Sequence, residues 1–131
     1  MSFLAKLKLD NDPDEMNVLH CDFPFSQGTD VTGKPTAIPK GGSIRLILES
    51  DGSTHLFDWM IDPIQLKSGI ITFYRRDSMS KLKTLEFTDA YCVCYNEVFD
   101  HTGEAPMQTE LTVSAREVKL NNSVFKNNWP V

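Results

Sequence analysis

Three carboxylates at alternate positions, Asp10, Asp12 and Asp14, have the spacing that opens a calcium-binding loop. Such a loop also needs glycine at its sixth position and a bidentate glutamate at its twelfth. Here these positions hold Glu15 and Cys21. We therefore interpret the segment as an acidic turn and predict no metal site in it.

Thiolates from Cys21, Cys92 and Cys94 could bind zinc, with His20 as a fourth ligand. His20 and Cys21 would face opposite sides of a strand, and the chain has no CxxC pair. Cys92 and Cys94 would share a strand face about 6.5–7 Å apart, too far for a disulfide. We predict three reduced thiols, consistent with folding in the cytosol.

The histidines, His20, His55 and His101, have no serine or cysteine motif around them. The chain contains no GxSxG, P-loop or HExxH pattern. We expect His20 on a strand, His55 in the first turn of a helix and His101 in a turn. The sequence predicts no catalytic residue, no cofactor and no enzyme.

Composition limits the class of protein further. Residues 1–131 amount to one domain with a net charge of −5, which argues against nucleic acid as a partner. The first residues, MSFLAKLKL, do not resemble a signal peptide. No apolar run approaches the ~20 residues of a membrane span, so we expect no direct membrane insertion.

Alternating hydrophobic and polar residues predict a mainly β fold. We expect strands over 3–9, 16–25, 43–49, 68–75, 84–99 and 108–120, separated by turns at 10–15 and near Gly103 and Pro106. The segment THLFDWMID predicts one short amphipathic helix with Ser53 or Thr54 as N-cap and an end near Pro63. This pattern indicates an antiparallel β-barrel of two packed sheets. The tail after Leu120 has no predicted structure.

Two strands have a predicted inner face that the alternation assigns directly. In the strand over 16–25 the inward residues would be Leu19, Cys21, Phe23 and Phe25, in line with Asn17. In the strand over 84–99 they would be Leu85, Phe87, Tyr91, Val93 and Tyr95.

The longest stretch without a regular pattern is SQGTDVTGKPTAIPKGG, residues 26–42, which we call the arm. Connections of this length inside a compact domain are uncommon and often functional. We predict that the arm contacts another molecule. Its candidate contact residues are Thr29, Asp30, Thr32, Lys34, Pro35, Thr36 and Ile38.

Two clusters of opposite charge suggest a second contact. The basic cluster is Arg75, Arg76, Lys81 and Lys83, and the acidic cluster is Asp10, Asp12, Asp14 and Glu15. The basic residues could simply form a solvated connector. If the clusters lie at opposite ends of the domain, copies could stack head to tail, with charge selecting partner and register.

Taken together, several segments resemble one family. They are MSFLAKLKLDND, NVLHCDFPFSQ, the arm, GGSIRLILES, FDWMIDP, ITFYRRDSMSKLKTLEFTDAYC and TELTVSAREVKL. In this order they are similar to the type VI secretion tube proteins, the TssD family, also called haemolysin co-regulated protein or Hcp. The resemblance runs from Met1 to about Trp129 and is most specific in YRRDSMSKLK and LESDGSTHLFDWMIDP.

The resemblance implies a structural role without covalent chemistry. It implies a β-barrel subunit of a homohexameric ring with a central pore, in rings that stack into a tube. Sheath contraction would expel this tube, with baseplate and spike proteins as partners and effector proteins in the lumen. The protein would be cytoplasmic until firing and extracellular afterwards, and the arm would reach a neighbouring ring.

Two other functions remain open from the residues alone. One is a monomeric β-barrel that binds a small apolar ligand in its interior. The other is an enzyme on a barrel scaffold, which would need perturbed titratable groups converging in a pocket. Hydrodynamic size distinguishes the ring from the monomeric carrier.

Overall fold

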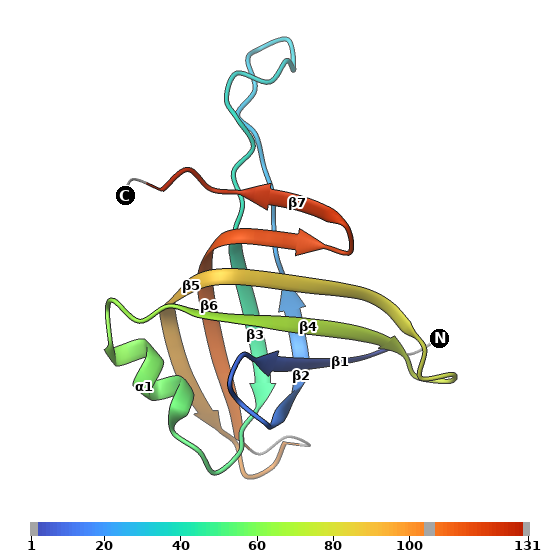
Figure 1. Ribbon diagram of the computed structural model, residues 1–131, viewed down its shortest axis with the longest axis vertical. Helices are drawn as coiled ribbons and strands as arrows, with labels where there is room; N and C mark the ends of the chain where they lie inside the picture. Colours follow the sequence, from blue (N-terminus) through green and yellow to red (C-terminus); the bar gives the residue numbers. More distant parts are fainter. Residues whose placement is uncertain (1–2, 104–106, 130–131) are drawn as a thin grey trace.

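A computed structural model of the chain describes residues 3–103 and 107–129. The elements are β1 (Phe3–Leu9), β2 (Glu15–Asp22), β3 (Ser43–Glu49), α1 (His55–Ile61), β4 (Lys67–Arg75), β5 (Lys81–Phe99), β6 (Met107–Leu120) and β7 (Ser123–Lys126) (Figure 1). The six predicted strands and the helix are confirmed, with ends shifted by one to three residues. Gly103 lies in the predicted turn, whereas Pro106 falls outside the described residues.

The strands form a closed antiparallel barrel. Their hydrogen-bonded order is β3-β2-β1-β4-β5-β6-β7, and β3 also pairs with β6, which closes the sheet on itself. β7 pairs with β6 beyond the end of β3 and lies outside the six-stranded barrel. The predicted fold class is confirmed, and the two packed layers are walls of one continuous sheet.

The barrel interior is filled by apolar side chains. β3 contributes Ile44, Leu46 and Leu48, which are buried at alternate positions, and β1 contributes Leu7 and Leu9. Trp59 from α1 joins the same cluster. This packed interior disfavours the monomeric ligand carrier, which would need a cavity there.

The predicted inner face of β2 is wrong in its first half. Met16 is buried and Val18 packs against the core, while Asn17 and Leu19 are exposed. The pairing with β3 shifts between Val18 and His20, which marks a bulge. A bulge inserts one residue and moves the side chains beyond it to the opposite face. Cys21 and Phe23 therefore pack against the core as predicted, whereas Phe25 lies beyond the end of β2 and is 45% exposed.

β5 also changes face. Its predicted inner face is wrong between two irregularities, one at Asp89 and one between Cys92 and Cys94. Leu85 and Phe87 are buried, but the next buried residues are Ala90 and Cys92. Asp89, between these pairs, has a φ of 52°, a left-handed conformation that breaks the alternation. A second irregularity between Cys92 and Cys94 returns Tyr95 to the core.

Two consequences concern the residues that were assigned to this face of β5. Tyr91 and Val93 do not join the core cluster, and Val93 is 52% exposed. Cys92 is buried and Cys94 is exposed, so they do not share a face as predicted.

Helix α1 begins at His55 after Thr54, which occupies the N-cap position, and Asp62 follows its end. Leu56 and Trp59 are buried, and the indole N–H of Trp59 donates to the Gln65 carbonyl at 3.1 Å. The helix has seven residues and is not long enough to cross a membrane, and the described residues contain no other helix. A helix this short depends on packing for its stability.

The arm is better ordered than predicted. Ser26 and Lys40 pair through two backbone hydrogen bonds of 3.0 and 2.7 Å, and Thr29 bridges Pro35. The arm is thus an extended pair of antiparallel legs that projects from one end of the barrel (Figure 1). Every residue from 24 to 40 is exposed, as expected for a segment without a core of its own.

Candidate assembly surfaces

The tip of the arm is organised around Asp30. Its Oδ1 accepts the Thr32 hydroxyl and the backbone N–H groups of Thr32 and Lys34, at 2.6, 2.8 and 3.1 Å. These donors, the Thr32 hydroxyl first, lower the pKa of the Asp30 carboxyl. Gly33, with a φ of +89°, completes a turn that other residues adopt only with strain. The side chain of Asp30 therefore organises the tip through Oδ1.

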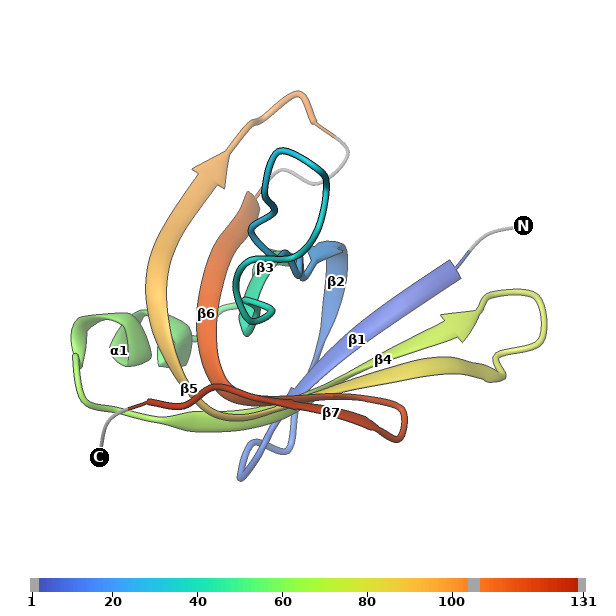
Figure 2. The same ribbon diagram turned by 90° about the horizontal axis from the view of Figure 1, so that it is seen from above.

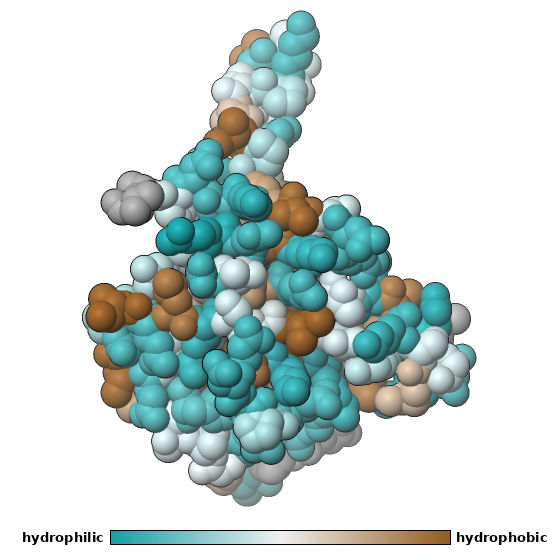
Figure 3. Space-filling model, viewed as in Figure 1, coloured by the Kyte–Doolittle hydropathy of each residue, from teal (hydrophilic) through white to brown (hydrophobic). Residues whose placement is uncertain are grey.

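The other arm candidates lie along the two legs. Thr29, Pro35 and Thr36 take part in the pairing of the legs, and the Thr36 N–H donates to the Gly28 carbonyl at 2.8 Å. Ile38 and Val31 are the large apolar residues that the arm exposes, at 74% and 105%. In the space-filling view the arm stands clear of the barrel, mostly hydrophilic with a few apolar positions (Figure 3).

The base of the arm is held by the tail, which the sequence left without structure. The ring of Phe25 meets Phe125 of β7 edge to face at 4.9 Å. The Asn127 amide donates to the carbonyls of Gly41 and Ala115 at 3.1 and 2.9 Å. We call Phe125 and Asn127 the clamp. It joins both legs of the arm to β6 and β7.

Glycines at the base make room for the clamp. A Cβ on Gly42 would lie 2.7 Å from the Ala115 carbonyl oxygen, and its φ of +94° suits glycine. A Cβ on Gly41 would lie 2.2 Å from the Phe25 ring. Phe125 and Trp129, isolated aromatics in a polar tail, are the signal that could have revealed this packing.

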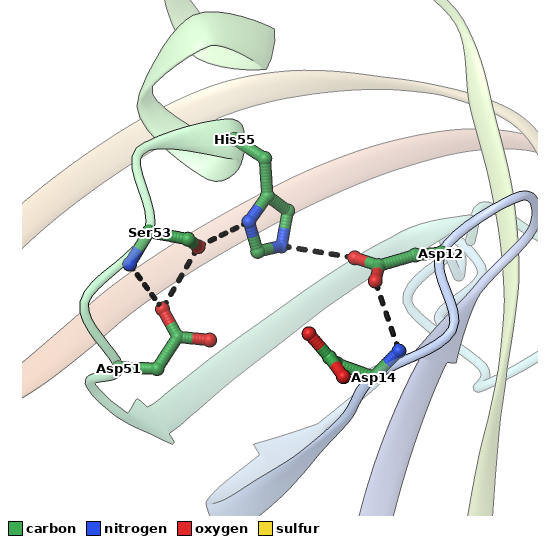
Figure 4. Close-up of polar contacts among 5 residues, drawn as sticks. All are labelled: Asp12, Asp14, Asp51, Ser53 and His55. Carbon is green, nitrogen blue, oxygen red and sulfur yellow. Dashed lines mark hydrogen bonds and ion pairs between the residues drawn. The ribbon is translucent and has the colours of Figure 1, made fainter.

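The acidic turn is attached to the start of α1 (Figure 4). Nε2 of His55 lies 3.3 Å from Asp12, at ion-pair distance but outside hydrogen-bond alignment. Asp12 also accepts the Asp14 N–H at 3.0 Å. On the other side of the imidazole, the Ser53 hydroxyl contacts Nδ1 and donates to Asp51 at 2.8 Å. The turn and the helix consequently form one surface.

This cluster has the residue types of a hydrolytic triad but not the hydrogen-bond connectivity of one. In a triad the serine faces Nε2 and the carboxylate faces Nδ1. Here Ser53 faces Nδ1, Asp12 faces Nε2, and the hydroxyl proton of Ser53 is engaged by Asp51. Ser53 lowers the pKa of the Asp51 carboxyl through its backbone N–H and then its hydroxyl. The cluster fixes local structure and does not activate a nucleophile.

The basic cluster occupies the hairpin between β4 and β5. Arg76 lies in the connecting loop, Lys81 begins β5, and the Arg75 guanidinium approaches the Ser80 hydroxyl at 3.5 Å. β1 and β4 pair from Phe3 opposite Arg75 to Leu9 opposite Gly69. The acidic turn, which follows Leu9, therefore lies at the opposite end of this strand pair from the hairpin. That is the arrangement that head-to-tail packing requires.

The cysteines are separate from one another. All three are free thiols, and burial followed by the charge of Asp22 raises the pKa of Cys21 to about 12. Burial also raises the pKa of Cys92 to about 11. Within residues 3–103 and 107–129, no three His, Cys, Asp or Glu side chains converge as metal ligands do.

Comparisons with known proteins agree with the β-barrel fold described above. The family model described as Hemolysin coregulated protein Hcp (TssD) matches residues 1–130. The solved structure of Hcp1 from Flavobacterium johnsoniae is 38% identical and superposes with a TM-score of 0.89, covering 95% of this chain and 99% of that one. The search of curated proteins returned no match.

More distant structures share the fold. Hcp1 from Salmonella typhimurium is 18% identical, with a TM-score of 0.75 over 92% of this chain and 86% of that one. A chain of the anti-feeding prophage baseplate is 16% identical, with a TM-score of 0.58 over 92% and 93%. With a family model that spans nearly its whole length, this chain belongs to the Hcp (TssD) family, the structural, non-enzymatic tube subunits of the type VI secretion system.

Proposed function

We propose that six copies of this chain close into a ring with a central pore and that the rings stack head to tail through the arm. The observation that carries this proposal is the arm itself. It is paired along its legs, closed at its tip by Asp30 and clamped at its base, yet every residue from 26 to 40 is exposed. A segment that is held in one conformation by its own hydrogen bonds and is still exposed is pre-organised to bind a partner.

The ring number has separate support. The structure of the anti-feeding prophage baseplate, which contains a chain of the same fold, was obtained with six-fold symmetry. Contacts around a ring close, whereas contacts from ring to ring continue without limit and build a filament. Both kinds of contact are needed for a tube.

The same proposal includes the partners and the destination of the tube. The tube assembles in the cytoplasm on baseplate proteins, carries spike proteins at its tip and effector proteins in its lumen, and is expelled when the sheath contracts. Family membership supports this assignment. Detection of the protein in culture medium of wild-type cells, and its loss from medium when the sheath is deleted, is the expected result.

Negative-stain electron microscopy of the purified protein tests the ring and the stack. We expect annular particles, and short tubes at high protein concentration. Deleting Thr32–Pro39 should leave rings but remove tubes, because the Ser26–Lys40 pair at the base remains to close a short hairpin. Replacing the same eight residues with glycine and serine keeps the length and tests whether side chains or reach matter.

Two results would contradict the proposal. Solitary molecules at high concentration, without annular particles, would exclude the ring. Tubes that persist after the deletion, or a deletion variant whose barrel unfolds, would exclude the arm as a separate stacking element.

A further inference from the structure

Two exposed faces lie at opposite sides of the barrel. The first, which we call the α1 face, has Phe57, Ile61 and Ile64 at 46%, 62% and 80% exposure. Hydrophobic side chains are visible along this edge of the molecule (Figure 3). The same part of the molecule has three exposed carboxylates: Asp58 on α1, Asp62 just after it, and Asp10 in the acidic turn that His55 joins to α1.

The second, which we call the hairpin face, is the β4–β5 hairpin with the adjacent strand ends. It exposes Phe3, Leu19, Met79 and Leu82. A notch of about 190 Å³ opens here, and its lining includes Phe3, Leu19 and Phe73. The notch exists because β2 pairs with β1 only from Ala5 to Lys8 and then continues along β3. The charged residues of the hairpin are the basic Arg75, Arg76, Lys81 and Lys83 and the single carboxylate Asp77, so the hairpin face is basic overall.

The line joining the two faces runs across the direction of the arm. In Figure 1 the arm points upward while α1 and the β4–β5 hairpin lie at left and right. Figure 2, seen along the arm, keeps α1 and the hairpin on opposite sides. The six steps of register between Phe3 and Leu9 span roughly 20 Å at about 3.3 Å per residue. A contact made by these faces is therefore directed sideways and not along the stack.

We infer that the α1 face of one copy docks on the hairpin face of the next copy and that this contact is the seam of the ring. The inference rests on the proposed ring and adds which surfaces form it. Each face has apolar side chains with charges around them, the usual anatomy of a protein interface. The charges are opposite, acidic on the α1 face and basic on the hairpin face, so they favour this pairing.

The charges also disfavour the two alternative pairings, in which like faces of two copies would meet. Two α1 faces would bring carboxylates together, and two hairpin faces would bring arginines and lysines together. Unlike faces can pair only head to tail, and repetition of a head-to-tail contact closes a ring when its rotation allows. The two-fold dimer is thereby disfavoured.

A charge exchange between two variants tests the seam. The acidic-face variant is Asp10→Lys with Asp58→Lys, and the basic-face variant is Arg76→Glu with Lys81→Glu. All four side chains are exposed, and none makes a hydrogen bond or ion pair to another described residue. Each variant alone places like charges across every seam. In an equimolar mixture, however, alternating copies restore opposite charges at all seams of an even-numbered ring.

Native mass spectrometry at low salt, supported by negative-stain imaging, gives the readout. We expect wild-type rings, at least a tenfold loss of rings for each variant alone, and alternating mixed rings in the mixture. The control variant, Lys34→Glu with Lys40→Glu on the exposed arm, changes net charge as much as the basic-face variant does. It should keep its rings.

The outcomes separate this inference from the proposed function. A wild-type protein without rings overturns both. Wild-type rings together with rings from either variant alone, or with folded variants that stay apart when mixed, overturn the seam and leave the tube subunit intact. Loss of rings in the control also overturns it, because net charge would then explain the result. Circular dichroism confirms that each variant is folded.

Discussion

At the scale of single residues, burial separates the three cysteines. The pKa of Cys21 is raised to about 12 and that of Cys92 to about 11, so both remain protonated thiols at neutral pH. Cys94 is exposed. Because the thiolate is the reactive form and access is also required, only Cys94 should react quickly with a thiol reagent.

Counting thiols with Ellman's reagent at pH 8 checks this prediction. We expect one fast thiol per folded chain, lost in a Cys94→Ser variant, and three thiols in urea. Equal rates for all three in the folded protein would contradict the burial of Cys21 and Cys92.

Asp30 gives the arm tip a defined pH dependence. Its pKa is lowered from 3.8 by the Thr32 and Lys34 donors. A carboxyl whose pKa is lower in the folded state contributes stability above its unfolded value and loses it as the pH falls through its folded value. The tip should therefore remain ordered from neutral pH down to about pH 4 and loosen only at lower pH.

Amide exchange at Thr32 and Lys34, followed by NMR across a pH series, measures how the order of the arm tip depends on pH. Asp30→Ala should raise the exchange of both amides at neutral pH, while Asp77→Ala, a loop carboxylate outside the arm, should leave them unchanged. A tip that loosens near pH 6 would contradict the role of Asp30.

At the scale of elements, the clamp determines how the arm is attached. Asn127→Ala removes donors from the Gly41 and Ala115 carbonyls and should cost about 1–3 kcal/mol. The loss should concentrate at the arm base, which hydrogen exchange of residues 24–42 can resolve. Asn128→Ala, an exposed neighbour, is the matched control and should change nothing. A uniform rise in exchange across the barrel would mean that the clamp supports the whole fold.

Two residues of helix α1 have different roles. Trp59 packs in the core, and Phe57 belongs to the α1 face that docks on another copy. Trp59 is 1% exposed and fills the core, so Trp59→Ala should lower the free energy of unfolding by about 3–5 kcal/mol. Phe57 is 46% exposed and belongs to the α1 face. Phe57→Ala removes an edge-to-face contact with Tyr95 and should cost the monomer only about 1–2 kcal/mol but weaken the ring.

Urea unfolding and ring dissociation, measured on the same samples, distinguish the two effects. If Phe57→Ala destabilised the monomer as strongly as Trp59→Ala, the assignment of Phe57 to a docking face would be wrong.

At the scale of the whole molecule, assembly should depend on salt. The charged side chains around both faces are exposed, and the screening length falls from about 10 Å at 0.1 M to about 3 Å at 1 M salt. Reversal of Arg76 and Lys81 to glutamate should therefore weaken self-association strongly in low salt and less as salt rises. Analytical ultracentrifugation across a salt series checks this, and a defect that does not change with salt would indicate lost packing instead.

The overall architecture was accessible from local pattern. Alternation in residues 3–9 and 43–49 and the helical spacing from Leu56 to Met60 each report on their own segment, and the structure confirms these elements. The ordered set of motifs also identified the family that the comparisons confirm. These features depend on residues close together in the chain, so the sequence by itself determined them.

Only the tertiary structure decided the faces of β2 and β5, the position of the tail and the places of the charged clusters. The bulges after Val18 and near Asp89 each move the later side chains to the other side of the sheet, and no residue type there announces the change. β7 forms because β6 offers it an edge beyond the end of β3. The acidic and basic clusters become opposite ends because β1 and β4 pair antiparallel over their full length. Each of these outcomes depends on pairing between distant segments, whose energies local sequence does not contain.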